Sequence, residues 1–293
     1  MSYWQQFCEE FSGKKVLVFG LGLQGGGVQV ANTLVKAGAQ VRVSDQKTAA
    51  ELATSLEQLD ASIETKLGSH LEEDINWAEF IIKNPGVPFS HPHLKLALQQ
   101  EKAVVGETAL ALSYLRNKSL AVTGTRGKTT TSHLIYHLLQ TAKIPSVLAG
   151  NIPGKPLLAQ LPELEHDTWV VIEIPSFQIE SLKHTQTSAH IAVITTLYPD
   201  HLNRYETWEE YVQAKTDLFA YQQAGDFSIY QADREWSAMI EASVGTEAIA
   251  VPVTQADIQN FKQRFTSRLP GEHNWENIAL ALKATASFDL SPD

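Results

Sequence analysis

Three scarcities limit what this 293-residue chain can be. Cysteine occurs once, at Cys8, so no internal disulfide can form, which is typical of proteins of a reducing cytoplasm. Basic residues number 23 against 33 acidic ones, and the net charge of −10 argues against a nucleic-acid-binding surface. No apolar run reaches membrane-spanning length, and the first residues lack the basic and apolar regions of a signal peptide. We therefore expect a soluble cytoplasmic protein that binds neither membrane nor nucleic acid.

Residues 120–131 are the stretch around which the chain is organised. The apolar run 120–122 predicts a strand, small residues and glycines follow it, and leucine and isoleucine then recur at helical spacing. A strand, a glycine loop, Lys128-Thr129 and a helix form the arrangement that binds a nucleotide triphosphate, because backbone N–H groups and the lysine ammonium face the phosphates. The general motif has a glycine where Val122 stands, and the extra glycine here is Gly124. An ordinary helix-capping turn is the alternative.

A second glycine loop lies near the N-terminus. The buried-strand pattern of residues 15–19 runs into G-x-G-x-x-G at 20–25, then a helix over 28–36 and a second strand over 40–43. Asp45 follows that strand, where an acidic residue meets a ribose hydroxyl in dinucleotide-binding units. The pattern indicates a nucleotide-type ligand, and glycines serving only close helix–strand packing are the alternative.

Strands and helices alternate along the rest of the chain, which indicates parallel sheets covered by helices on both faces. The polar turn 116–118 marks the predicted domain junction. The fold class we expect is α/β, with a Rossmann-like N-terminal domain over 1–115 and a central domain like those of P-loop NTPases over 116–293.

Two charged residues lie where chemistry is expected. Glu173 follows the apolar run 169–172, at the carboxyl end of a predicted strand, where a carboxylate can hold Mg²⁺; a surface ion pair is the alternative. Lys215 falls within the apolar stripe of the helix predicted over 207–221. Its side chain either extends to water or has its ammonium desolvated and its pKa lowered. A neutral amine can react with CO₂ to give a carbamate whose oxygens suit Mg²⁺.

Histidine and asparagine pairs are less informative. His91 and His93 flank Pro92 in a polar loop, and we expect them to be solvent-exposed rather than metal ligands. Asn274 and Asn277 share a face in the first turn of a predicted helix. Their amides can hydrogen-bond a base or ribose, or can be plain capping groups.

Taken together, ordered motifs over nearly the whole chain resemble the Mur ligase family. They are GTRGKTTT at 124–131, Gly150-Asn151-Ile152, Asp200-His201-Leu202 and His273-Asn274-x-x-Asn277. Within the family, the loop 20–25 and EIPSFQIE at 173–180 are most similar to the members that add D-glutamate.

The resemblance implies roles residue by residue. Lys128, Glu173, His201 and Lys215 would be catalytic. Thr129 and Glu173 would bind one Mg²⁺, and His201 with carbamylated Lys215 a second. The residues implied for ATP are Gly124, Thr125, Arg126, Gly127, Lys128, Thr129, Thr130, Asn274 and Asn277. Those implied for the sugar-nucleotide substrate are Gly22, Leu23, Gln24, Asp45, Gln46, Asn151 and Ser176.

The implied activity belongs to peptidoglycan precursor synthesis. An ATP-dependent ligase would join D-glutamate to UDP-N-acetylmuramoyl-L-alanine through an acyl phosphate, as a monomer. Three residues depart from the family pattern: Arg126 replaces an Asn, Pro175 a Ser, and Asn203 an Asp. Family members also carry a third, C-terminal domain that binds the amino acid, so we expect this two-domain form to be inactive or weakly active by itself.

Other functions remain open. A dinucleotide-dependent oxidoreductase would explain the first glycine loop but not the Lys128 loop. A non-catalytic nucleotide-binding module, or a ligase of the same family that adds another amino acid or extends folate, are the further alternatives.

Overall fold

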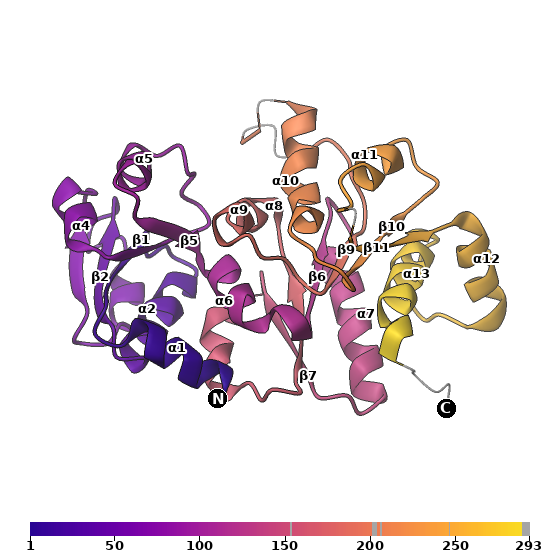
Figure 1. The fold of residues 1–293 in the computed structure, drawn as a ribbon, viewed down its shortest axis with the longest axis horizontal. Helices are drawn as coiled ribbons and strands as arrows, with labels where there is room; N and C mark the ends of the chain where they lie inside the picture. The colour runs from indigo at the N-terminus through magenta and orange to yellow at the C-terminus, as the bar shows by residue number, and fades with distance from the viewer. Residues whose placement is uncertain (153, 201–203, 206, 246, 289–293) are drawn as a thin grey trace. The chain divides into compact units, whose positions relative to one another are not determined.

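The computed structural model describes residues 1–152, 154–200, 204–205, 207–245 and 247–288. The chain folds into two compact units. Unit 1 comprises Met1–Tyr114 and Ile152–His166, and unit 2 comprises Leu115–Asn151 and Asp167–Asp293. Each unit has a central sheet with helices packed against it (Figure 1).

Unit 1 has a five-stranded parallel sheet in the order β3-β2-β1-β4-β5. Its strands are β1 (Lys15–Phe19), β2 (Gln40–Asp45), β3 (Glu64–Leu67), β4 (Phe80–Lys83) and β5 (Ala103–Gly106). Its helices are α1 (Tyr3–Phe11), α2 (Gly26–Lys36), α3 (Ala53–Leu56), α4 (Glu72–Trp77), α5 (Pro92–Gln99), α6 (Glu107–Leu115) and the 3₁₀ turn η2 (Leu158–Glu163).

Unit 2 has a six-stranded parallel sheet in the order β11-β10-β9-β6-β8-β7. Its strands are β6 (Ser119–Thr123), β7 (Ser146–Gly150), β8 (Trp169–Glu173), β9 (Ile191–Ile194), β10 (Phe227–Gln231) and β11 (Ile249–Val253). Its helices are α7 (Lys128–Thr141), α8 (Ser176–Ile179), α9 (Leu182–Thr185), α10 (Trp208–Ala220), α11 (Ser237–Glu241), α12 (Gln255–Arg264) and α13 (His273–Thr285), with 3₁₀ turns η1 (Arg116–Lys118) and η3 (Ala286–Phe288).

The expected α/β class with parallel sheets is confirmed. Central strands were predictable because they are buried apolar runs: four of the five residues of β1, and all of those of β6 and β9, are buried. The sequence pattern did not predict β3, the edge strand Glu-Thr-Lys-Leu, whose residues are exposed or half-buried. An edge strand of this kind needs no apolar run, so periodicity cannot reveal it.

Residues 152–166, which the sequence analysis placed in the second domain, group with unit 1. The backbone N–H of Leu158 donates to the buried carboxyl of Glu107 at 3.0 Å, and the Tyr3 hydroxyl donates to the carbonyl of His166 at 3.3 Å. Burial raises the pKa of Glu107. The chain therefore leaves unit 2 after β7, packs on unit 1, and returns to form β8. The predicted boundary between 115 and 116 stays a prediction.

No helix in the described part of the chain is long and apolar enough to cross a membrane.

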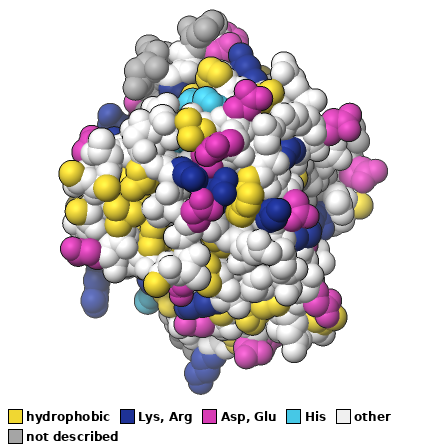
Figure 2. Space-filling model, turned by 90° about the vertical axis from the view of Figure 1, so that its left-hand side faces the viewer, with side chains coloured by type: hydrophobic (Ala, Val, Ile, Leu, Met, Phe, Trp, Pro, Cys, Tyr) yellow, Lys and Arg dark blue, Asp and Glu magenta, His cyan; other side chains and the backbone are white. Residues whose placement is uncertain are grey.

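On the face drawn in Figure 2, acidic and basic side chains lie next to one another among hydrophobic ones.

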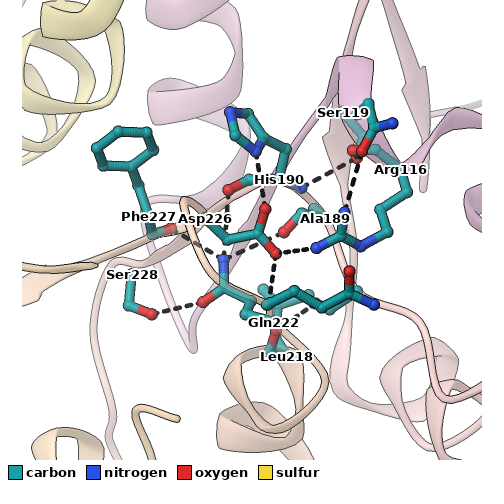
Figure 3. A network of polar contacts seen from close by, with 12 residues as sticks. Arg116, Ser119, Ala189, His190, Leu218, Gln222, Asp226, Phe227 and Ser228 are labelled. Carbon is teal, nitrogen blue, oxygen red and sulfur yellow. Dashed lines mark hydrogen bonds and ion pairs between the residues drawn. The ribbon is translucent and has the colours of Figure 1, made fainter. Parts of the chain in front are cut away.

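A polar network closes the amino-terminal edge of the unit 2 sheet (Figure 3). Asp226, which directly precedes β10, is buried and accepts hydrogen bonds from Arg116, from His190 Nδ1 at 2.8 Å and from the N–H of Gln223 at 2.7 Å. The amide of Gln222 donates to the carbonyls of Ala189 and Phe227 at 3.1 and 3.0 Å. The network thus ties together the starts of β6, β9 and β10.

We expect Asp226→Asn to destabilise the protein by about 3 kcal/mol. The new amide NH₂ group would face N–H donors of its neighbours, and Arg116 and His190 would lose the carboxylate that they share. Chemical denaturation measures the loss. The control is Asp217→Asn on α10, whose carboxylate bonds only Gln213 among the described contacts and should cost about 0.5 kcal/mol or less. Equal losses in the two variants would contradict the assignment of Asp226 to a structural network.

Candidate functional site: a phosphate loop beside a buried carboxylate

The loop between β6 and α7 is fastened to the end of β9. The N–H of Thr125 donates to the carbonyl of Thr196 at 2.7 Å, and the N–H of Arg126 donates to the Thr196 hydroxyl at 3.0 Å. The Thr195 hydroxyl lies within hydrogen-bonding distance of the carbonyls of Thr123 and Arg126. Two of the loop's N–H groups are therefore used internally, and the loop's path is set by two threonines that the sequence analysis did not select.

The remaining donors belong to the start of α7, a helix of 14 residues. Gly127 is its N-cap, with φ of +88° and no side-chain capping bond. The first N–H groups of a helix have no partner within the helix, and with the helix dipole they make a site for an anion. Arg126 and Thr129 are exposed beside these groups, and Thr130 is half-buried.

Two glycines are required by close approach. A Cβ on Gly124 would lie 2.0 Å from the Thr195 hydroxyl oxygen and 2.9 Å from the Thr196 nitrogen. A Cβ on Gly127 would lie 2.4 Å from Asn277 Oδ1. Both residues also have positive φ, so any other residue would be strained as well as crowded.

Two lysines converge on the loop. Lys128 Nζ donates to the carbonyls of Gly124 and Thr125 at 2.9 and 3.1 Å, and Lys215 Nζ, from α10, donates to the same Gly124 carbonyl at 3.0 Å. Burial lowers the pKa of Lys128, although the carboxylates of Glu173 and Asp200 oppose this. Burial and then the neighbouring charge of Lys128 lower the pKa of Lys215 to about 7, with Asp200 acting in the opposite direction.

Of the two environments considered for Lys215, the structure shows the desolvated one, since the residue is only 2% exposed. An amine with a pKa of about 7 is largely neutral at slightly alkaline pH, which is the form that reacts with CO₂.

A buried carboxylate lies at the end of β8. Glu173 is 4% exposed, and its Oε2 is buried without a hydrogen-bond partner in the described structure. Its Oε1 accepts a bond from the Asn151 amide at 3.3 Å, and its carbonyl accepts from the Asn151 N–H at 2.8 Å. A surface ion pair is therefore wrong for Glu173. An orphaned carboxylate oxygen fits a hard divalent cation, which prefers oxygen ligands.

The second predicted metal site, His201 with Lys215, cannot be assembled because His201 lies outside the described residues, as does Asn203, one of the three departures from the family pattern. Within the described residues, no group of three or more His, Cys, Asp or Glu side chains could hold a metal by itself. The Mg²⁺ site predicted from Thr129 and Glu173 stays a prediction.

Asn274 and Asn277 lie on α13, which packs against α7. Both are buried, and their amides bond protein groups: Asn277 Nδ2 donates to Asn274 Oδ1 at 3.0 Å, and Thr131 donates to Asn277 Oδ1 at 3.3 Å. Their amides are thus engaged in holding α13 against the phosphate loop, and contact with a nucleotide stays a prediction.

Ser176 begins α8 and is buried, with a hydrogen bond to Tyr205. Tyr205 also donates to Glu180 at 2.8 Å, and Arg204 bonds both oxygens of Glu180. This cluster ties α8 to the chain ahead of α10, and the sequence pattern contained no signal for it because the partners are far apart in the chain.

In unit 1 the structure brings Asp45 to the first glycine loop. Asp45 Oδ2 accepts from the N–H groups of Leu21 and Gly22 at 2.8 and 3.1 Å, and Oδ1 accepts from the N–H of Lys47 at 2.9 Å. The carboxylate therefore holds the loop in shape. Leu23, 62% exposed, and Gln24 and Gln46, both exposed, are the predicted contacts that face solvent.

The expected solvent exposure of His91 and His93 was wrong. Both are half-buried, and they cluster with the ring of His70, 5.3 Å from His91 and 6.3 Å from His93 between centroids. His70 stacks on Phe19, and burial, followed by the charge of His91, lowers its pKa to about 4. Both rings lie near the buried ring of Phe19, which explains why the polar flanking sequence wrongly predicted exposure.

Comparison with known proteins agrees with these features. The Mur ligase middle domain matches residues 122–285, and the N-terminal domain of MurD-like Mur ligases matches residues 14–106. UDP-N-acetylmuramoylalanine–D-glutamate ligase of Koribacter versatilis is 38% identical over 96% of this chain, and that of Listeria monocytogenes is 36% identical over 97%. The chain spans 65% of the length of each.

Solved structures show the same fold. UDP-N-acetylmuramate-alanine ligase from Thermotoga maritima superposes over 95% of this chain and 66% of its own, with a TM-score of 0.54 and 20% identity. A UDP-N-acetylmuramate:L-alanyl-γ-D-glutamyl-meso-diaminopimelate ligase superposes over 95% of this chain and 94% of its own, with a TM-score of 0.61 and 17% identity. The middle-domain match covers more than half of this chain, and the N-terminal-domain match covers most of the rest. The chain therefore belongs to the Mur ligase family.

Proposed function

We propose that this chain forms the sugar-nucleotide-binding and ATP-binding part of a ligase that adds D-glutamate to UDP-N-acetylmuramoyl-L-alanine, with a C-terminal domain supplying the amino-acid site. The observation that carries the proposal is the phosphate loop of unit 2, where the free donors of α7 and the ammonium of Lys128 lie in the same unit as the unpartnered oxygen of Glu173. The relatives from Koribacter versatilis and Listeria monocytogenes carry that activity in their names.

The reaction has a physical logic. A carboxylate resists attack by an amine because its oxygen is a poor leaving group. Transfer of the γ-phosphoryl group from ATP to the carboxylate of UDP-N-acetylmuramoyl-L-alanine gives an acyl phosphate and ADP. The amine of D-glutamate then attacks the acyl carbon, the tetrahedral intermediate collapses, and phosphate leaves as the amide bond forms.

Each residue of the loop has a proposed part. The N–H groups at the start of α7 would bind the β- and γ-phosphates, and Lys128 would turn from the loop carbonyls to neutralise their charge. Thr129 and Glu173 would hold Mg²⁺, which when bound would withdraw charge from the phosphates. Asn151, exposed and hydrogen-bonded to Glu173, would contact the substrate and the transferring phosphate.

Lys215 would serve as a carbamate. Its neutral amine adds to the carbon of CO₂ and releases one proton, leaving a carbamate anion in place of the neutral amine. With His201 it would then supply ligands for a second Mg²⁺. The supporting observations are burial of the amine and its pKa of about 7.

Unit 1 would bind the UDP part of the substrate through Gly22, Leu23, Gln24, Asp45 and Gln46. A dinucleotide oxidoreductase is the weaker explanation, because it would leave the Lys128 loop without a role.

Calorimetric titration with UDP-N-acetylmuramoyl-L-alanine, Mg·ATP and NAD tests the proposal. We expect the first two ligands to bind and NAD not to bind. Tight binding of NAD without binding of the sugar nucleotide would overturn it.

A further inference from the structure

The hydroxyl of Thr125, in the middle of the phosphate loop, makes three polar contacts. It accepts from the N–H of Tyr198 at 3.0 Å, lies 3.2 Å from the carbonyl of Tyr198, and lies 2.9 Å from the hydroxyl of Tyr211. A threonine hydroxyl has one proton to donate and two lone pairs to accept with. All three contacts are satisfied together when Thr125 donates to the Tyr198 carbonyl and Tyr211 donates to Thr125. The hydroxyl is then saturated by protein and has nothing left for a ligand.

Tyr211 is held rigidly in α10. Its ring is fully buried, and its centroid lies 5.4 Å from that of the Tyr205 ring and 5.7 Å from that of the Trp208 ring. Burial raises the pKa of the Tyr211 phenol, so the hydroxyl keeps the proton that it donates.

Tyr211 and Lys215 are four residues apart, on one face of α10. Lys215 Nζ lies 4.8 Å from the centre of the Tyr211 ring and donates to the carbonyl of Gly124. The helix therefore holds two consecutive loop residues, Gly124 through a buried hydrogen bond and Thr125 through a half-buried one.

The loop is fastened from both sides. On one side, the carbonyl and hydroxyl of Thr196 accept hydrogen bonds from the N–H groups of Thr125 and Arg126. On the other side, Tyr211 of α10 is hydrogen-bonded to the Thr125 hydroxyl. This division leaves the N–H groups that begin α7 for an anion.

We propose that Tyr211 is a positioning residue of the phosphate loop: through the hydroxyl of Thr125 it holds the loop in the shape that receives the nucleotide's phosphates. The proposal rests on the nucleotide-binding part of the proposed function and assigns Tyr211 no contact with the nucleotide itself.

A double-mutant cycle on Mg·ADP affinity tests it. Tyr211→Phe removes the donor and keeps the ring, and Thr125→Val removes the shared hydroxyl and keeps the shape. Tyr211→Phe is expected to weaken Mg·ADP binding about fivefold, the effect of one lost hydrogen bond, and Thr125→Val at least as much, because it removes all three contacts of the hydroxyl. The double variant should bind no more weakly than Thr125→Val alone. Thr125→Ser keeps the hydroxyl and should bind Mg·ADP more tightly than Thr125→Val.

The control for removing a tyrosine hydroxyl is Tyr221→Phe, at the C-cap of the same helix, which should leave affinity unchanged. Hydrogen exchange gives a second readout: Tyr211→Phe should speed exchange in the loop 124–127 while the thermal midpoint changes little.

The outcomes separate the two proposals. If the unaltered protein does not bind Mg·ADP, the proposed function fails. If it binds and Tyr211→Phe binds equally well, or if the losses in the double variant multiply as for independent sites, the positioning role of Tyr211 is wrong.

Discussion

Lys215→Ala should reduce amide-forming turnover about a thousandfold in a form extended by the proposed C-terminal domain, the scale seen when a charge-stabilising group is removed from an active site. The expected cause is loss of the carbamate, and with it the ligands that Lys215 would supply at a buried position where water cannot easily substitute. Phosphate release in the presence of D-glutamate measures turnover.

The same variant offers a chemical rescue. Acetate carries a carboxylate small enough to occupy the space of the missing side chain, and we expect it to restore part of the activity. Lys95→Ala, which removes an exposed lysine on α5, is the control and should keep full activity. Undiminished turnover in Lys215→Ala would remove the lysine from the mechanism.

The modification can also be observed without turnover. With ¹³C-labelled bicarbonate, a carbamate resonance should appear in the unaltered chain and be missing from Lys215→Ala. Because the pKa of Lys215 is lowered to about 7, the neutral amine is the minor form below that pH and the major form above it, so the signal should grow as pH rises from 6 to about 8.

Gly124→Ala is expected to lower the free energy of unfolding by about 3 kcal/mol and to abolish measurable Mg·ADP binding. The new methyl group would sit 2.0 Å from the Thr195 hydroxyl and 2.9 Å from the backbone nitrogen of Thr196. A side chain can rotate away, but the end of β9 cannot move without breaking the bonds that shape the loop.

The matched control is Gly225→Ala. Gly225 also has positive φ, +86°, but a Cβ there would meet nothing within 4 Å. This variant therefore carries the backbone strain without the clash and should cost about 1 kcal/mol with unchanged nucleotide affinity. If the two variants behave alike in denaturation and titration, crowding at Gly124 is not what makes glycine necessary.

Local patterns were enough to predict the central strands and the two glycine loops. An apolar run such as 120–122 reports burial on both faces of a sheet, and a glycine cluster after it reports a turn that needs positive φ, so both signals lie within a few neighbouring residues. The apolar stripe around Lys215 was likewise visible, although it left open whether the amine reached water.

Side-chain partners across the chain were beyond such patterns. Thr196 and Tyr211 lie some 70 and 86 residues from the loop residues they bond, and the parallel sheet and α10 bring them there. Asp45 shows the same limit. Its place at the end of β2 was predictable, but the bonds from the first glycine loop to its Oδ2 depended on the path of that loop.

The sequence by itself thus determined where the central strands and main helices form and which residues lie at the carboxyl ends of those strands, because both follow from local hydrophobic periodicity. Only the tertiary structure decided which of those groups are used up by the protein and which, like Glu173 Oε2, stay unpartnered, because hydrogen bonds in a folded chain depend on distances between residues that are remote in sequence.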